Sequence, residues 1–65
     1  MRNNNQLIIG KKHKLYYQKN ESEIYPYIAI IKDEEGNTVK KVGLTEKSNT
    51  PDLRKILIEY EENNL

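Results

Sequence analysis

Residues 24–44 read IYPYIAIIKDEEGNTVKKVGL and predict a β-hairpin. The first arm, Tyr25 to Lys32, is rich in tyrosine and isoleucine, which favour extended backbone. The second arm runs from Thr38 to Leu44. Between the arms, residues 33–37 form a polar connection of hairpin length, in which Gly36 or Asn37 can adopt the positive φ of a tight turn. Pro26 has no amide hydrogen, so we expect it at the start of the first arm.

Side chains of the first arm alternate between two faces, and both faces are apolar. One face carries Ile24, Ile28 and Ile30, and the other carries Tyr25, Tyr27, Ala29 and Ile31. This pattern is typical of a central strand covered on both sides, or of a strand whose second face binds a partner. The sequence leaves open which of the two faces a helix covers.

A helix is predicted from Pro51 to about Asn63. Thr50 is a suitable N-cap, Pro51 suits the first helical position, and Asp52 lies favourably at the positive end of the helix dipole. One apolar stripe follows at helical spacing: Leu53, Ile56, Leu57 and Tyr60. Three acidic residues stand near the negative end of the dipole, so we expect the last turn to fray: Glu59, Glu61 and Glu62.

The N-terminal half is less clearly patterned. We expect a flexible tail over residues 1–6 and a single small domain over residues 7–65. Two apolar pieces, Leu7–Ile9 and Leu15–Tyr17, are interpreted as one strand bent at Gly10, with two separate short strands as the alternative. The predicted fold class is therefore α+β: a small antiparallel sheet of about three strands with one C-terminal helix packed on one face.

Composition argues against an enzyme. The 65 residues include no cysteine and one histidine, His13, which stands among lysines without a companion nucleophile or acid. The acidic run of residues 33–35 lacks the alternating oxygen spacing of a calcium loop. We therefore expect no catalytic residues, no metal, no cofactor and no small-molecule substrate. No apolar run approaches the roughly 20 residues of a membrane span, so we expect a cytoplasmic protein without a membrane partner.

Charge is unevenly distributed although the formal net charge is only +1. Residues 1–32 carry six basic and two acidic side chains, a net charge of +4, whereas residues 33–65 carry five basic and eight acidic ones, a net charge of −3. This asymmetry permits opposite charges on two faces of the folded molecule.

The leading functional hypothesis is a small non-catalytic protein-binding module, such as a regulator or inhibitor from a phage or mobile element. It would bind through the sheet face opposite the helix, around Tyr25, Tyr27 and Ile31, with the basic edge at residues 11–14 attracting an acidic partner. Self-association through the same face or through a strand edge belongs to this class.

The alternative hypothesis is a nucleic-acid-binding module. Lysines would neutralise phosphates while tyrosines stack on bases. The candidate residues are Lys11, Lys12, Lys14, Tyr16, Lys40 and Lys41. The small net charge and the acidic helix favour the first hypothesis, because dedicated nucleic-acid binders usually carry a clear basic excess.

Two resemblances bear on this alternative. The stretch from Tyr27 to Leu57 resembles the arm-type DNA-binding domain of tyrosine recombinases, and Lys41–Thr45 leading into the helix resembles the single-strand-binding fold of a transcriptional coactivator type. Both resemblances imply a sheet that contacts DNA. The recombinase modules usually carry more basic and aromatic residues on the contacting strands than this chain does. Fold analogy alone does not assign function.

Overall fold

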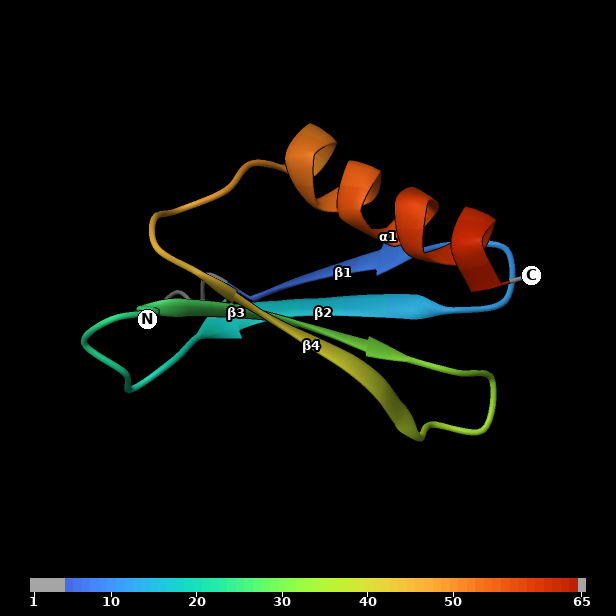
Figure 1. Cartoon of the computed structure of the whole chain (residues 1–65), viewed down its shortest axis with the longest axis horizontal. Coiled ribbons are helices and arrows are strands. Elements are labelled where there is room, and N and C mark those ends of the chain that lie inside the picture. The colour runs from blue at the N-terminus through green and yellow to red at the C-terminus, as the bar shows by residue number, and fades with distance from the viewer. Residues whose placement is uncertain (1–4, 65) are drawn as a thin grey trace.

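The computed structural model describes residues 5–64, which form a four-stranded antiparallel sheet with one helix across one face (Figure 1). The elements are β1 (Gln6–Ile9), β2 (Lys14–Lys19), β3 (Tyr27–Lys32), β4 (Thr38–Leu44) and α1 (Thr50–Asn64). The strands are neighbours in chain order, β1-β2-β3-β4. The predicted α+β class, antiparallel sheet and C-terminal helix are confirmed, with four strands rather than about three. Of the tail predicted for residues 1–6, the first four lie outside the described residues, and Gln6 already belongs to β1.

The additional strand results from a turn that begins at Gly10 and separates β1 from β2. The two apolar pieces around it form separate strands that pair in antiparallel register, with Ile8 opposite Leu15, so the prediction of one bent strand was wrong. The amide of Gly10 donates to the carbonyl oxygen of His13 at 2.8 Å and closes a tight turn between β1 and β2. Contacts from the distant helix hold this turn, which explains why local sequence did not reveal it.

The core lies between the sheet and α1. Its buried apolar members are Ile8, Leu15, Tyr17, Ala29, Ile31, Leu53 and Leu57. The predicted helical stripe is confirmed, because Ile56 and Tyr60 pack at the margin of this cluster. The ring of Tyr17 stacks on Tyr27 with centroids 5.7 Å apart, and its hydroxyl accepts a hydrogen bond from the amide of Ser48 at 3.1 Å. Tyr17 therefore links the sheet to the segment that leads into the helix.

The structure also resolves which face of β3 is covered. The helix packs against β1 and β2 on the face that carries Ala29 and Ile31, both fully buried. Strand register explains this choice. Ile31 pairs with Leu15 and Ile8 lies beyond it, so this face presents an unbroken apolar surface. On the other face the same register pairs Lys14 with Lys32.

The start of α1 is capped by Asn49 rather than by Thr50. The Asn49 side-chain oxygen accepts the amide of Asp52 at 3.2 Å, and its carbonyl oxygen accepts the amide of Leu53 at 3.1 Å. Thr50 begins the helix, and its hydroxyl donates to the side-chain oxygen of Gln6 at 3.0 Å. The first turn of α1 is thus attached to the beginning of β1.

The β3–β4 turn is as predicted, with Gly36 at a φ of 87°. One carboxylate oxygen of Asp33 accepts the amides of Glu35 and Asn37, each at 2.9 Å. The Asn37 amide in particular lowers the pKa of the Asp33 carboxyl below its usual value. Backbone amides of the turn therefore stabilise the negative charge of Asp33.

Candidate functional site

The sheet face turned away from α1 is the candidate site, and Figure 1 shows that no element among residues 5–64 covers it. A row of four paired residues crosses its centre: Leu7, Tyr16, Ile30 and Lys41. Each comes from a different strand, so the row spans the whole sheet. We call this surface the open face.

Tyr16 lies near the middle of the open face and is partly exposed. The ammonium nitrogen of Lys32 stands 5.0 Å from the centroid of the Tyr16 ring. This distance is within the range of a cation–π contact. Lys14 shares the face with Tyr16 on the same strand and pairs with Lys32 across the sheet.

The strand positions of the open face carry only basic charges, and the acidic residues Asp33 and Glu34 of the β3–β4 turn line a hollow with Lys14 at its margin. The four strands contain five lysines and no aspartate or glutamate. Three of these lysines, Lys14, Lys32 and Lys41, occupy open-face positions in the register. Helix α1, on the opposite side, carries four acidic and two basic residues. The helix thus has a formal net charge of −2 (two basic minus four acidic residues), whereas the strand positions of the open face hold three lysines and no acidic residue.

A second tyrosine lies at the end of the open face. Gly43 pairs with Ile28 on this face, and a Cβ atom at Gly43 would come within 2.7 Å of the Tyr25 ring. The missing side chain at Gly43 thus provides the space for Tyr25 to lie against the sheet. Tyr25 is 45% exposed there.

The residues predicted for protein binding do not form one surface. Tyr25 lies on the open face, but Ile31 is fully buried beneath the helix and Tyr27 packs against the same core. The sheet face opposite the helix is therefore not the Tyr27/Ile31 face that the sequence interpretation named. The apolar positions that the open face does present from β3 are Ile28 and Ile30, each partly exposed.

The residues predicted for nucleic-acid binding are divided among three places. Lys14, Tyr16 and Lys41 lie together on the open face, where Lys32, which the prediction omitted, joins them. The others lie in two further places: Lys11 and Lys12 belong to the β1–β2 turn, and Lys40 lies on the helix side with its ammonium 5.9 Å from the centroid of the Tyr60 ring. The alternation of side chains along β3 could have identified Lys32, because it shares parity with Ile28 and Ile30.

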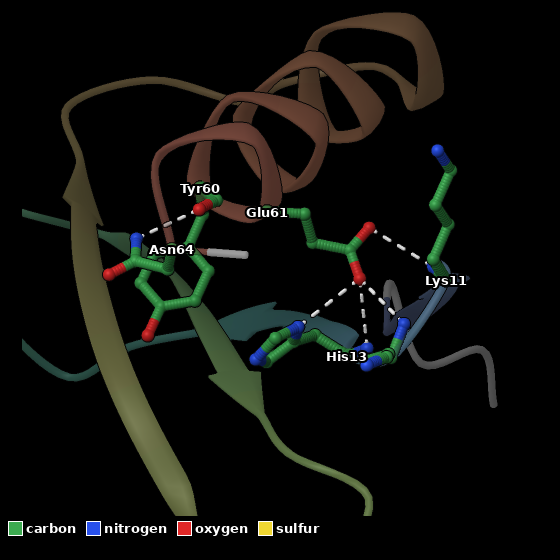
Figure 2. Close-up of polar contacts among 6 residues, drawn as sticks. Lys11, His13, Tyr60, Glu61 and Asn64 are labelled. Atoms are coloured by element: carbon green, nitrogen blue, oxygen red, sulfur yellow. Dashed lines mark hydrogen bonds and ion pairs between the residues drawn. The ribbon is translucent and has the colours of Figure 1, made fainter.

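A buried carboxylate that the sequence interpretation missed fixes the end of the helix against the sheet (Figure 2). The oxygens of Glu61 accept backbone amides from Lys11 at 3.0 Å, Lys12 at 2.7 Å and His13 at 3.0 Å. The His13 ring nitrogen Nδ1 lies 3.1 Å from the same carboxylate. Gly10 makes room for it, because a Cβ there would approach the carboxyl carbon of Glu61 to 2.9 Å.

The same contacts explain the ionisation of Glu61. Burial alone would raise its pKa, but the amides of Lys12 and Lys11 together with the side chain and amide of His13 lower the pKa to about 2. The carboxylate held in this way attaches the last turns of α1, which extends to Asn64, to the β1–β2 turn. His13 is therefore a structural partner, and its ring also contacts Tyr60 edge-on at 5.2 Å.

Among residues 5–64, no group of three or more histidine, cysteine or acidic side chains is placed to hold a metal ion. In this part of the chain, no helix combines the length and the apolar character needed to cross a bilayer.

Comparison with known proteins adds no assignment: no family model matches the sequence, and neither curated proteins nor solved structures give a match.

Proposed function

We propose that the protein binds single-stranded nucleic acid on its open face. The observation that carries the proposal is the position of Tyr16 at the centre of an uncovered sheet, with Lys14, Lys32 and Lys41 around it and no acidic residue in any strand. Aromatic rings provide stacking platforms for unpaired bases, and lysines track the phosphates between them.

The geometry suits a single strand better than a duplex. A base can stack on Tyr16 once the flexible Lys32 side chain leaves the ring, and the released ammonium can then contact a phosphate. Tyr25 offers a second platform at the end of the same face. No described helix projects from this face to enter a groove, as reading of duplex DNA usually requires.

Fluorescence anisotropy of a labelled oligothymidine of about 12 nucleotides tests the proposal. Wild type should bind, and affinity should fall as salt rises from about 50 to 200 mM. Replacing Lys14 or Lys41 by alanine should weaken binding and reduce the salt slope by about 0.7 each. Tyr16→Ala should weaken binding roughly 5- to 140-fold, the effect of losing one base–aromatic stack.

Lys55→Ala, an exposed lysine of α1, is the matched control and should bind like wild type. Circular dichroism of each variant confirms that the sheet is intact. Equal losses for the Lys55 and Lys41 variants would mean that binding is a general charge effect and would refute the proposed site.

A protein partner on the same face is the second candidate, in keeping with a regulator or inhibitor. The observation that favours it is the apolar part of the open face, where Leu7 is 50% exposed and Tyr25 is 45% exposed. Under this candidate, wild type would not bind the oligonucleotide at about 50 mM salt. Leu7→Ser would then abolish capture of a protein that wild type and Lys55→Ala both retain.

A further inference from the structure

A second apolar patch lies where the edge strand β1 meets α1, and its β1 member, Ile9, pairs with Lys14 at the margin of the open face. Ile9 is 71% exposed and Ile58 is 45% exposed, although both are large apolar side chains. Together with Leu57 they line a hollow of about 250 Å³. Small-molecule sites usually measure about 300–1,000 Å³, so this hollow better suits an inserted side chain.

The charges beside this hollow point to the occupant. Four charged residues line it: Lys11, Arg54, Glu61 and Glu62. Glu61 is already bound to the β1–β2 turn, whereas Arg54 and Glu62 lie one helical turn before and one turn after Ile58. A two-fold axis passing close to Ile58 would set two α1 helices antiparallel. Arg54 of one chain would then lie against Glu62 of the partner subunit, and the reverse pair would form at the same time. The positions of Arg54 and Glu62 therefore make this surface complementary to itself in charge.

We propose that Ile9, Arg54, Ile58 and Glu62, which we call the helix rim, form the interface of a symmetric dimer of this chain. The two Ile58 side chains pack at the axis and fill the hollows beside the two Ile9 side chains. Two reciprocal ion pairs between Arg54 and Glu62 of the partner subunit fix the orientation.

The size of the chain supports a second copy as the occupant. A chain of 65 residues buries a limited share of its surface, and this one contains no cysteine to form a disulfide. Ile9 adjoins the open face through its pairing with Lys14, but Arg54 and Glu62 belong to α1 on the other side of the sheet. The charge-reversal variants of Arg54 and Glu62 therefore test the dimer without changing an open-face residue.

Sedimentation equilibrium of the full chain, from about 10 µM to 1 mM protein at about 50 mM salt, tests the dimer. Wild type should show a monomer–dimer equilibrium. Arg54→Glu alone sets two acidic residues against each other, and Glu62→Arg alone sets two arginines against each other. Each single variant should dimerise about tenfold more weakly or worse.

An equimolar mixture of these two variants gives the sharpest result. Both contacts in a mixed dimer pair glutamate with arginine, so the mixture should recover dimers that neither variant forms alone. Glu59→Arg makes the same charge change on the same helix but outside the helix rim, and should dimerise like wild type.

Three outcomes would overturn the proposal. Wild type that stays monomeric up to 1 mM shows that no such dimer forms. Dimers that persist in both single charge-reversal variants place the interface elsewhere, such as on the open face. A mixture that remains monomeric shows that Arg54 and Glu62 do not face each other across an axis.

Discussion

At the scale of single residues, Glu61 connects the C-terminal turns of α1 to the turn between β1 and β2. Its carboxylate receives three backbone amides of the β1–β2 turn, and it belongs to the last turns of α1. Successive amides that point at one anion form a favourable site for negative charge. Here the anion is supplied by the chain itself, so the turn and the helix end stabilise each other.

Glu61→Gln should therefore lower the free energy of unfolding by about 2–4 kcal/mol. The amide side chain offers one acceptor oxygen, and its NH₂ group faces amide donors that need an acceptor. Urea unfolding followed by circular dichroism measures the change. Glu59→Gln, an exposed neighbour on the same helix, should change stability by less than about 0.5 kcal/mol. Equal stabilities for the two variants would contradict the role assigned to Glu61.

The same carboxylate predicts the acid stability of the protein. Its pKa falls from 4.5 to about 2 in the folded state, so the folded form binds this proton less readily than the unfolded form. The stabilisation that the Glu61 carboxylate gives to the folded state is then complete above about pH 4.5 and is lost as pH falls toward about 2. Unfolding measured in this range should show a steeper loss of stability for wild type than for Glu61→Gln, and parallel curves would refute the assignment.

At the scale of secondary-structure elements, local sequence predicted those features that depend on neighbouring residues. The turn at Gly36 and the helical stripe of Leu53 and Leu57 follow from turn chemistry and from helical spacing, and both are present. The division into β1 and β2 depends on Glu61, which lies 48 or more residues along the chain from the turn it holds. No local pattern around Gly10 contains that information.

The candidate site was only partly predictable for a similar reason. Alternation along β3 correctly separated its two faces, but the choice of the covered face depends on what β1 and β2 place beside it. Ile8 and Leu15 extend the Ile31 face, whereas Lys14 interrupts the other one. Tyr16 and Lys14 lie on a common face, as their spacing of two residues on β2 requires.

The cap of α1 provides a test at this scale. Asn49→Ala should cost about 1 kcal/mol of stability, because the amide of Asp52 loses its side-chain acceptor. Thr50→Ala should cost less, since the Thr50 hydroxyl bonds only to the exposed side chain of Gln6. Thermal unfolding of both variants shows which one loses more stability. A larger loss of stability for Thr50→Ala would identify Thr50 as the cap instead of Asn49.

At the scale of the whole molecule, the fold separates charge by side. The charged residues of the strands are all lysines, and three of the five lie on the open face, whereas α1 carries four acidic and two basic residues. A nearly neutral chain thus presents a row of positive charge on the open face. Net charge alone therefore underestimates the attraction of the open face for an anionic polymer. The acidic side in turn disfavours wrapping of such a polymer around the helix.

The most direct measurement is the salt dependence of oligothymidine binding by wild type, by Tyr16→Ala and by the double variant Lys14→Ala/Lys41→Ala. If the open face binds single strands, wild type should show a clear salt slope, which the double variant reduces by about 1.4. Tyr16→Ala should weaken binding and leave the slope unchanged, because stacking involves no counterion release. Absence of binding by folded wild type at about 50 mM salt, or an unchanged slope in the double variant, would contradict the proposed function.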